Sequence, residues 1–539
     1  MILRIGLDFD NTIANYDQAF PDVARILGYQ TKATNKRDLK TELFASAEGE
    51  TAWQKVQGLT YGKHIDQANL YPGVLEFVVR AKARNCEVFI ISHKTQFGHF
   101  DPSKTSLRDA ATAWMISKRI VGEEAAQVQE ANVFYASTRD EKITKIKELN
   151  LDVFIDDLSE VLTDQSFPET TKKILFGRDS DQADTSEATI LNIQSWREVG
   201  NELFGSINPA DVRFGVQQFW PHLECSIVAQ VEGRGNSKIF RLETSVGPIA
   251  LKVYPDKHVD TRPRRQTEWS ALHFLFANKL QTPVPVATDS ELNWSLLEWV
   301  AGVSGNQQDN LHLYIAADFV RGLNETAKTL DRSSLFTFAT ESCLTPELVE
   351  QQIRGRLTAL KSIQDDDLQQ FLINKVEPKL VDKVQQAQET LGEKYSTQLG
   401  EEFWTLSPSD FGLHNAIITP LGDIVFFDFE YFGWDDPVKL TADFCHHPGM
   451  SISVCAQKFW IGQMKNVFGS DPNFMRRLSA LYPLYAIRWS LIILNEFRSD
   501  KIKNRLHAQS RMQSDIRNAQ IAQLEKAKSM IENLDRSIF

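Results

Sequence analysis

Short apolar segments alternate with helical patterns over about the first 200 residues. Some have the character of buried strands, and others have the three-to-four-residue spacing of amphipathic helices. The strand candidates are residues 2–9, 87–92 and 153–155, and the helix candidates are residues 75–84 and 142–149. Such alternation predicts a mostly parallel sheet with helices on both faces. A polar stretch at 178–187 predicts a surface loop, and residues 190–196 predict a last strand that runs into a helix.

The pattern changes from Cys225 onward. Glycine-containing turns separate short strand candidates at 226–231, 238–243 and 248–254, which indicates an antiparallel sheet. Helical patterns dominate after Thr261, interrupted by a strand candidate at 294–300 and a hairpin at 416–429. Residues 440–539 have a helical pattern throughout. This change predicts two domains, 1–205 and 206–539, and a cut between Phe204 and Val212 should give two separately melting fragments.

Composition and charge narrow the class of protein. The chain has 539 residues, of which 42% are hydrophobic and 24% charged, as in globular proteins with two or three domains. Its net charge of −12 argues against a nucleic-acid partner, since such proteins neutralise phosphates with lysine and arginine. The five cysteines form no C-x-x-C pair, which disfavours a zinc ribbon or disulfide framework and favours the reducing cytoplasm.

Export and membrane insertion are both disfavoured. The first eight residues become charged too early for the apolar core of a signal peptide. The most apolar stretch, 481–494, is shorter than the ~20 residues that cross a bilayer, and it contains Arg488. We therefore expect a cytoplasmic protein with no membrane partner.

The motif Asp8-Phe-Asp10-Asn-Thr12 follows the first strand candidate. Two carboxylates two residues apart can both project from the carboxyl end of the strand, where open α/β sheets bind ligands. Because like charges this close repel each other, the site requires a bound cation or a raised pKa. A hard cation such as Mg²⁺ suits carboxylate oxygens and bridges to phosphate.

Further polar groups follow later strands of the same predicted sheet. Ser92 ends one strand and offers a hydroxyl to a phosphate oxygen, while Asp156 and Asp157 end another. Lys142 and Lys145 precede that last strand, and either could supply a cation.

These groups, in this order, resemble the four motifs of the haloacid-dehalogenase (HAD) phosphohydrolase superfamily over about residues 1–200. The resemblance implies a Rossmann-like fold in which Asp8 is the nucleophile that forms an aspartyl-phosphate, and Asp10 is the general acid/base. The phosphoryl group would be bound by Thr12, Ser92 and a lysine, for which we favour Lys142 over Lys145. The Mg²⁺ ligands would be Asp8, the backbone carbonyl of Asp10, Asp156 and Asp157.

Residues 14–75 separate the first of these motifs from the second. An insertion of this length resembles the small helical cap that HAD enzymes close over small substrates, which favours a phosphorylated metabolite over a phosphoprotein. Four of its side chains could either reach the substrate or only pack the cap: Trp53, Tyr61, Lys63 and His64.

A second constellation lies in the C-terminal half. Asp410 and Asn415 are five residues apart in Ser407-Pro-Ser-Asp-Phe-Gly-Leu-His-Asn415, and a hairpin then leads to Asp428. This arrangement suits phosphoryl transfer, in which one aspartate orients the attacking hydroxyl while an asparagine and a second aspartate hold Mg²⁺ on the nucleotide phosphates.

Upstream groups complete a nucleotide site. Lys252 ends the apolar segment Ile249-Ala-Leu-Lys252, and Glu268 follows on a predicted helix, which allows a Lys–Glu ion pair. Between the first two strands, the backbone amides of Gly233-Arg-Gly-Asn-Ser237 can cover phosphates. A basic cluster could bind an anion, although a solvated helix face explains it better: Arg262, Arg264 and Arg265.

These residues resemble the aminoglycoside phosphotransferase and choline kinase group, which has a protein-kinase-like fold, over about residues 215–500. The resemblance implies an α+β bilobal domain, with an N-lobe at about 212–300 and a helical C-lobe at about 301–539. It makes Asp410 the catalytic base and Asn415 and Asp428 Mg²⁺ ligands. The nucleotide-binding residues would be Gly233, Gly235, Ser237, Lys252, Glu268 and, beside adenine, Glu298 and Val300. Asp436 and Asp443 would brace the C-lobe.

The chain departs from this family at Pro408-Ser409, where the family has His-Gly before the catalytic aspartate. The hydrogen bonds of the catalytic loop are therefore in question.

The sequence predicts a bifunctional small-molecule enzyme of mixed α/β class. A Mg²⁺-dependent phosphatase would act on a phosphorylated metabolite, and a kinase would transfer phosphate from ATP or another nucleoside triphosphate to a hydroxyl acceptor. Because action on one position would be a futile cycle, the sites should act on different positions or intermediates, as phosphosugar or amino-alcohol metabolism would allow. A polynucleotide kinase–phosphatase is disfavoured by the acidic charge and the lack of a G-x-x-x-x-G-K-[S/T] loop. In a third hypothesis only one domain is catalytic, and the other is a sensor or scaffold.

Overall fold

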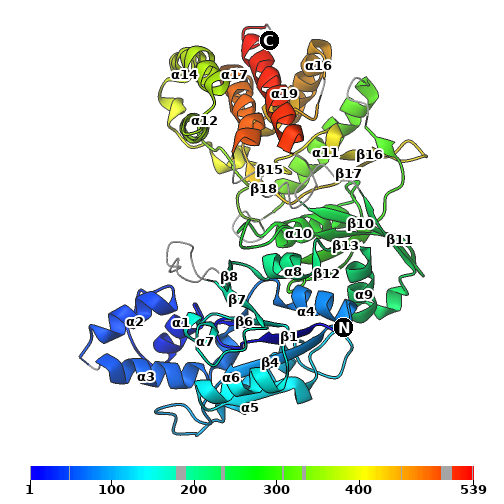
Figure 1. Cartoon of the computed structure of the whole chain (residues 1–539). Helices are drawn as coiled ribbons and strands as arrows, with labels where there is room; N and C mark the ends of the chain where they lie inside the picture. The colour runs from blue at the N-terminus through cyan, green and yellow to red at the C-terminus, as the bar shows by residue number, and fades with distance from the viewer. Residues whose placement is uncertain are drawn as a thin grey trace.

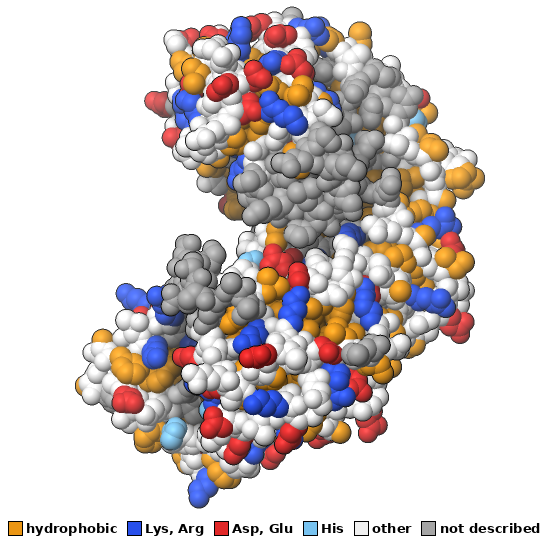
Figure 2. Space-filling view, viewed as in Figure 1, with side chains coloured by type: hydrophobic (Ala, Val, Ile, Leu, Met, Phe, Trp, Pro, Cys, Tyr) orange, Lys and Arg blue, Asp and Glu red, His pale blue; other side chains and the backbone are white. Residues whose placement is uncertain are grey.

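A computed structural model gives the arrangement of the chain (Figure 1). It describes residues 2–47, 49–177, 190–231, 237–305, 309–330, 336–450, 452–498, 513–536 and 538–539. The expected surface loop at 178–187 lies outside these residues. On the face shown in Figure 2, the molecule is hollowed between the N-terminal part and the C-terminal helices, and acidic and basic side chains are interspersed.

Six parallel strands form the sheet of the N-terminal part, in the order β5-β4-β1-β6-β7-β8. The strands are β1 (Arg4–Leu7), β4 (Glu87–His93), β5 (Val133–Ala136), β6 (Val153–Asp156), β7 (Lys172–Phe176) and β8 (Ile190–Ile193). The helices around them are α4 (Val74–Ala83), α5 (Leu107–Ser117), α6 (Arg139–Glu148), α7 (Ser159–Leu162) and α8 (Trp196–Phe204). The predicted parallel sheet is confirmed. Because β1 lies between β4 and β6, their carboxyl ends meet at one edge.

Helices cover both faces of this sheet, since successive strand residues point to opposite sides. Phe89 and Ile91 of β4 belong to an apolar cluster with residues of α6 and α7. Val88 and Ile90 belong instead to a larger cluster with residues of α4, α5 and α8.

A helical insertion follows β1, within the range expected for a cap. Its helices are α1 (Ala19–Ile26), α2 (Lys36–Phe44) and α3 (Gly49–Thr60), and its base is closed by β2 (Ala14–Asn15) paired with β3 (Asn69–Leu70). Helix α3 approaches the loop after β4 backbone to backbone, since a Cβ on Gly58 would lie only 2.2 Å from the carbonyl oxygen of His99.

The second half begins with the expected antiparallel sheet, in the order β12-β13-β11-β10-β9. Its strands are β9 (Ile227–Val231), β10 (Lys238–Thr244), β11 (Gly247–Val253), β12 (Pro285–Asp289) and β13 (Trp294–Glu298), and α10 (Arg264–Ala277) covers one face.

The rest of the chain is mainly helical. Its helices are α11 (Asn310–Ala327), α12 (Pro346–Lys361), α13 (Asp366–Phe371), α14 (Glu377–Leu391), α15 (Pro437–His446), α16 (Val454–Val467), α17 (Phe474–Ile493) and α19 (Gln513–Glu532). Short strands form two small sheets: β14 (Val303–Ser304) with β16 (Ala416–Ile418) and β17 (Ile424–Phe426), and β15 (Thr405–Ser407) with β18 (Gly433–Asp435). The apolar stretch 481–494 lies mostly in α17, and no helix of the described residues could span a membrane.

The two large sheets share one apolar core. Helices α4, α8 and α9 (Pro209–Phe219) lie between them (Figure 1). A single cluster of buried residues joins Val79 of α4 and Trp196 of α8 to Val216 of α9, and it continues to Leu251 and Trp294 of the five-stranded sheet. A cut at the expected boundary would expose this apolar surface on both fragments. The structure therefore does not support the expectation of two separately melting fragments.

A buried polar network crosses the same boundary. Glu76 of α4 pairs with Arg197 of α8 at 2.6 Å and accepts a hydrogen bond from the indole of Trp294 at 3.3 Å. Arg197 also donates to the backbone carbonyl of Tyr254, just after β11, at 2.5 Å. Its neighbour Trp196 donates to the backbone carbonyl of Thr12 at 2.9 Å. Helix α8 thus contacts backbone next to both candidate sites.

Candidate functional sites

The first site lies at the carboxyl ends of β1, β4 and β6. The Nζ of Lys142 lies 2.6 Å from Oδ1 of Asp8 and 2.6 Å from Oδ2 of Asp156, and all three side chains are buried. Burial raises the pKa of Asp8 well above its usual value, although Lys142 opposes the shift. Burial opposes the charged form of Lys142 as well, but Asp156 and Asp8 raise its pKa above the usual value. Lys145 instead pairs with Glu148 at the surface, so the structure brings only Lys142 to the two aspartates.

Two hydroxyls at this site are buried and make no hydrogen bond. They belong to Thr12 and Ser92. A buried hydroxyl without a partner carries a desolvation cost, which a bound oxyanion would remove. Thr12 follows β1, the strand that precedes Asp8, and Ser92 lies in the neighbouring strand β4, so the pair fits an anion.

Oxygen ligands for a divalent cation are also present. Carboxylate oxygens of Asp8, Asp156 and Asp157 lie within 4.8 Å of one another. Burial, followed by the charge of Asp156, raises the pKa of Asp157 to about 7. A cation among these carboxylates would stabilise their ionised forms, so the donor set fits Mg²⁺.

Asp10 has partners that the sequence motif did not indicate. The Nζ of Lys94 lies 3.0 Å from its Oδ1 and 2.9 Å from its Oδ2, and the hydroxyl of Tyr16 donates to Oδ1 at 2.7 Å. Lys94 lies two residues after Ser92, so a lysine immediately beyond that strand was the available signal. Tyr16 lies just after β2, and its contact depends on the fold of the cap.

One lysine of the helical insertion, Lys36, also lies at this site. The Nζ of Lys36 lies 3.0 Å from the hydroxyl of Tyr61 and 3.4 Å from Oδ1 of Asn11. Burial lowers the pKa of Lys36, and within the described chain no carboxylate oxygen lies within 4.0 Å of its Nζ. Of the other cap residues considered, Trp53 is buried and stacks on Phe20, and Lys63 is exposed.

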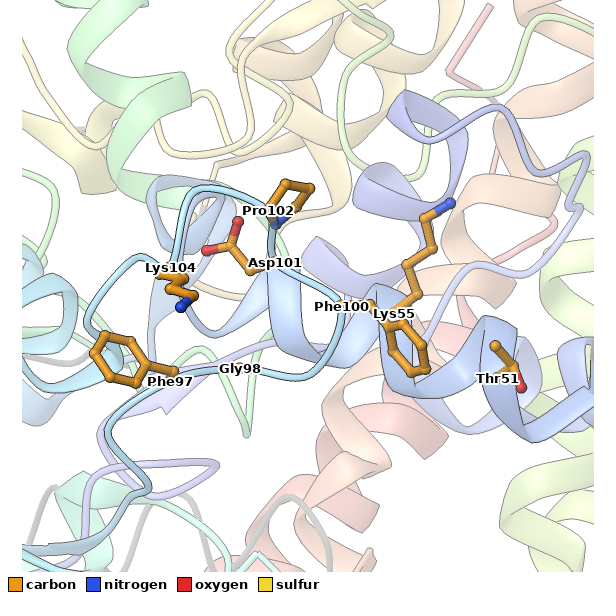
Figure 3. A pocket seen from close by; sticks show the side chains of 8 residues that line it. All are labelled: Thr51, Lys55, Phe97, Gly98, Phe100, Asp101, Pro102 and Lys104. Carbon is orange, nitrogen blue, oxygen red and sulfur yellow. The ribbon is translucent and has the colours of Figure 1, made fainter.

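A surface pocket of about 600 Å³ lies between α3 and the loop after β4 (Figure 3). It is lined by Thr51, Lys55, Phe97, Gly98, Phe100, Asp101, Pro102 and Lys104. None of the residues expected to take part in catalysis lines it.

The second site joins the five-stranded sheet to the helical part. The Nζ of Lys252 lies 2.8 Å from Oε2 of Glu268 and 2.6 Å from Oδ1 of Asp428. Burial opposes the charged form of Lys252, but Asp428 and Glu268 raise its pKa well above the usual value. Glu268 is held by the hydroxyl of Tyr254 at 2.6 Å and by the amide of Phe429 at 3.2 Å. The predicted Lys–Glu ion pair is therefore present, with Asp428 beside it.

Glu430 is an additional acid at this site. It lies 3.3 Å from Nζ of Lys252, and its carboxylate also pairs with Arg264. Carboxylate oxygens of Glu268, Asp428 and Glu430 lie within 4.8 Å of one another and offer ligands to a divalent cation. The expectation of a solvated arginine face is wrong for Arg264, which is buried because Glu430 and Asp260 neutralise its charge. Arg262 pairs with Asp260 closer to the surface, and Arg265 donates to Thr288.

Two residues of the second site have unusual backbone geometry. Ser409 has a φ of 65° and Asp428 a φ of 70°, in the left-handed region where glycine is favoured. Ser409 stands where the related family has glycine, and its hydroxyl donates to the carbonyl of Thr340 and accepts from Lys439 at 3.0 Å. The two bonds of its hydroxyl hold Ser409 in this left-handed conformation, although it is not a glycine.

Asp410 is contacted by two imidazoles. Nε2 of His414 and Nε2 of His447 each lie 3.1 Å from its Oδ1. Burial would raise the pKa of Asp410, but the contacts with His414 and His447 hold it well below its usual value. The side chain of Asn415 donates to the backbone carbonyl of Asp410 at 3.0 Å, and among the described residues no donor contacts its side-chain oxygen, which could bind a ligand.

The remaining expected residues lie as follows. Ser237 lies near Glu430 at 3.5 Å, and the carboxylate of Glu298 at the end of β13 accepts from the amide of Val284 at 3.1 Å. Val300 lies two residues after the end of β13, and Gly233 and Gly235 lie outside the described residues. Asp436 and Asp443 are buried and pair with arginines of α17, as a bracing role requires; their partners are Arg477 and Arg488.

The region of the second site matches a known protein family. Residues 227–444 match the model of the phosphotransferase enzyme family. The C-terminal region contains a phosphotransferase-type domain. The match includes Lys252, Glu268, Asp410 and Asp428. It ends before α16, and it covers less than half of the chain.

Individual relatives are distant. A putative nucleotidase of Oceanobacillus iheyensis is 25% identical over 181 residues, which are 32% of this chain and 86% of that protein. Among solved structures, a Plasmodium vivax ethanolamine kinase is similar with a TM-score of 0.42 and 12% identity, over 66% of this chain and 99% of that one. The choline kinase LicA of Streptococcus pneumoniae is similar with a TM-score of 0.39 and 14% identity, over 60% of this chain and 98% of that one.

Proposed function

We propose that the chain is a bifunctional small-molecule enzyme. In this proposal residues 1–205 form a Mg²⁺-dependent phosphatase of HAD type, and residues 206–539 form a kinase that uses ATP or another nucleoside triphosphate. The kinase acceptor would be a hydroxyl of a small molecule, and the phosphatase substrate a phosphorylated metabolite. Phosphosugar or amino-alcohol metabolism in the cytoplasm would suit both.

The phosphatase assignment is supported above all by Lys142, which bridges Asp8 and Asp156 beside two unpartnered hydroxyls. Mg²⁺ held by Asp8, Asp156, Asp157 and the Asp10 carbonyl would neutralise charge on the phosphoryl oxygens. Asp8 would attack phosphorus and form an aspartyl-phosphate while Asp10 protonates the leaving oxygen. Asp10 would then take a proton from water for hydrolysis. Lys94 and Tyr16 would hold the Asp10 carboxylate in place for both steps.

The kinase assignment is supported above all by the ion pairs of Lys252 with Glu268 and Asp428, within the region that matches the phosphotransferase model. Mg²⁺ on Asp428 and Asn415 would neutralise the β- and γ-phosphates of the nucleotide. Lys252 would bind those phosphates, and Glu268 would hold Lys252 in position. Asp410 would accept the proton of the attacking hydroxyl, and positioning would supply most of the rate enhancement.

Substitution of Asp8 tests the phosphatase. Asp8→Asn keeps the shape of the side chain but removes the nucleophile, so hydrolysis should fall by several orders of magnitude. The assay is phosphate release from p-nitrophenyl phosphate and a panel of phosphorylated metabolites with Mg²⁺. Asp164→Asn is the matched control, because Asp164 only caps a local turn through Ser166. Near-normal hydrolysis by Asp8→Asn would refute the assignment.

Two substitutions test the kinase. Asp428→Ala should abolish productive binding of Mg–ATP, whereas Asp410→Ala should leave nucleotide binding largely intact and remove turnover. Both variants are titrated with Mg–ATP by calorimetry and assayed for phosphoryl transfer to a library of hydroxyl compounds. Asp423→Ala in the exposed hairpin turn is the control. Normal transfer by Asp410→Ala would refute the mechanism, and a wild-type chain that binds no nucleotide would refute the kinase itself.

A second candidate function is favoured by the shared core. Helices α4 and α8 share one apolar core with the five-stranded sheet and make hydrogen bonds to Trp294 and Tyr254, so the N-terminal half could serve as a scaffold for the kinase without turnover of its own. In that case Asp8→Asn would change no activity, while the kinase would still require residues 1–205.

A further inference from the structure

The two imidazoles at Asp410 form an ordered pair. Their rings are stacked, with centroids 3.8 Å apart and planes 9° from parallel. His414 comes from the catalytic loop itself, whereas His447 lies directly after α15. Both Nε2 atoms approach the same oxygen, Oδ1 of Asp410. Within the described chain, no hydrogen bond or ion pair involves the other oxygen, Oδ2.

The tautomer of His447 follows from its second nitrogen. The backbone amide of Gly449 donates to Nδ1 of His447 at 3.0 Å. An amide N–H can only donate, so Nδ1 carries no proton and the proton of the neutral ring is on Nε2. That N–H faces Asp410. Nε2 of His447 lies 3.1 Å from Oδ1 of Asp410, so its N–H can donate to the carboxylate.

The ring of His447 is also fixed from behind. Trp489 of α17 packs edge-on against it, with centroids 4.6 Å apart and planes at 81°. The indole of Trp489 donates in turn to Oδ1 of Asp443 at 2.7 Å. A buried, paired aspartate of α15 thus holds the tryptophan that packs on the histidine, which restricts the direction of the Nε2 proton.

The stack does not favour a metal ion bound by Asp410, His414 and His447, although their ligand atoms are close enough. An imidazole nitrogen binds a metal through a lone pair in the plane of its ring, at about 2.0–2.1 Å. Two stacked, nearly parallel rings share no plane, so one ion cannot align with both lone pairs. N–H···O contacts tolerate more misalignment than metal coordination, and Nε2 of each ring lies 3.1 Å from the same carboxylate oxygen.

We propose that His447 is a positioning residue for Asp410. Its neutral Nε2–H, supported by the stacked ring of His414, holds Oδ1 and turns Oδ2 toward the hydroxyl that is to be deprotonated. This inference rests on the proposed kinase function. It assigns the orientation of the base to a residue outside the catalytic loop, at the start of the segment after α15.

The first test compares substitutions at two adjacent histidines in the full chain. His447→Ala should lower the rate of Mg–ATP hydrolysis to water by roughly 10- to 100-fold, since a small displacement of a catalytic group has effects of this size. The dissociation constant for Mg–ATP should change less than about twofold, because within the described chain His447 makes no hydrogen bond, ion pair or ring contact with a proposed nucleotide-binding residue. His447→Gln keeps a donor and should retain an intermediate rate. His446→Ala is the matched control: its half-buried ring lies at the same helix end but faces the carbonyl of Tyr482, so the rate should stay normal.

The second test needs no nucleotide. Nitrogen NMR of the full chain labelled in its histidine rings should show His447 at neutral pH as the Nε2–H tautomer, identified by the signal that is lost in His447→Gln. A Nδ1–H tautomer or a doubly protonated ring would overturn the inference, as would a normal hydrolysis rate in His447→Ala. A wild-type chain that binds no Mg–ATP would overturn the proposed function, and with it this inference, whatever the tautomer.

Discussion

The substitution Glu76→Gln probes how firmly the two halves of the chain are joined. Glu76 is 1% exposed and lies on α4, and its carboxylate pairs with Arg197 and accepts from Trp294. Arg197 continues the network to the carbonyl of Tyr254. Glutamine keeps the volume of the side chain and can still accept from the indole. The substitution therefore removes mainly the negative charge, and Arg197 becomes a cation without its main partner.

The structure sets the size of the effect. Removal of one partner from a buried ion pair costs about 3–5 kcal/mol, because the remaining charge stays desolvated. At ~1.4 kcal/mol for each factor of ten, the unfolding equilibrium constant should rise roughly 10²- to 10³-fold or more. Glu87→Gln is the matched control, since its pair with Arg4 spans 3.1 Å with side chains 45% and 36% exposed. An exposed pair of this kind contributes only about 0–1 kcal/mol.

Equilibrium urea unfolding followed by tryptophan fluorescence measures the effect, since Trp196 and Trp294 both lie in the shared core. The parallel sheet and the five-stranded sheet should unfold in one transition, and Glu76→Gln should shift that transition as a whole. A cost below about 1 kcal/mol, equal to that of the control, would refute the interpretation of the buried network. Two separate transitions, of which only one moves, would refute the coupling between the sheets.

The same variant has a defined pH dependence. Burial alone would raise the pKa of Glu76, but Arg197 and Arg80 hold it below its usual value of 4.5. A carboxylate with a depressed pKa in the folded state contributes its full stability above the pKa of the unfolded chain, and loses it as the pH falls through the folded value. The difference in stability between wild type and Glu76→Gln should therefore be constant at neutral pH and shrink below about pH 4.5. A difference that grew on acidification would contradict this sign.

Two further predictions concern the cap. Gly58→Ala places a Cβ 2.2 Å from the carbonyl oxygen of His99, so α3 must move away from the loop after β4. The KM of the proposed phosphatase for its phosphorylated substrates should therefore rise. Gly355→Ala, whose Cβ meets nothing within 4 Å, is the control. An unchanged KM would show that this contact does not set the closed cap. Lys36→Met removes the cation beside Tyr61 and Asn11 and should raise KM by about tenfold with little change in kcat, because a uniform binding interaction is lost. Lys40→Met, one turn further along α2 and facing Trp53, should leave KM unchanged, and equal effects of the two substitutions would exclude a specific role for Lys36.

The aspartates at the strand ends of the first site could be predicted from the sequence, because each one follows a local apolar pattern. Asp8 and Asp156 each follow an apolar run, and the parallel order of β1, β4 and β6 brings such ends together. The Lys252–Glu268 pair could be predicted for the same reason, since a strand and the next helix fix both residues. These parts of the candidate sites need no long-range information beyond the order of elements.

Other parts depend on contacts that no local pattern contains. The apolar face of α4 is visible in the sequence, but nothing in its spacing indicates that it covers two sheets instead of one. Lys36 and Tyr16 reach the first site only because the cap folds over it. His447 is separated from Asp410 by a hairpin, a small sheet and a helix, so its contact depends on tertiary packing alone.

Helix α8 makes it difficult to exchange either half of this chain by recombination. Two consecutive residues contact different neighbourhoods: Trp196 reaches the carbonyl of Thr12, and Arg197 reaches that of Tyr254. Consider a chimera in which residues 1–205 come from one parent protein and the rest of the chain from another. Its α8 would have to fit the backbone at Thr12 of the first parent and the backbone at Tyr254 of the second. The natural crossover points for such a protein therefore lie elsewhere, and substitutions in this helix should be inherited together with compensating changes on both sides.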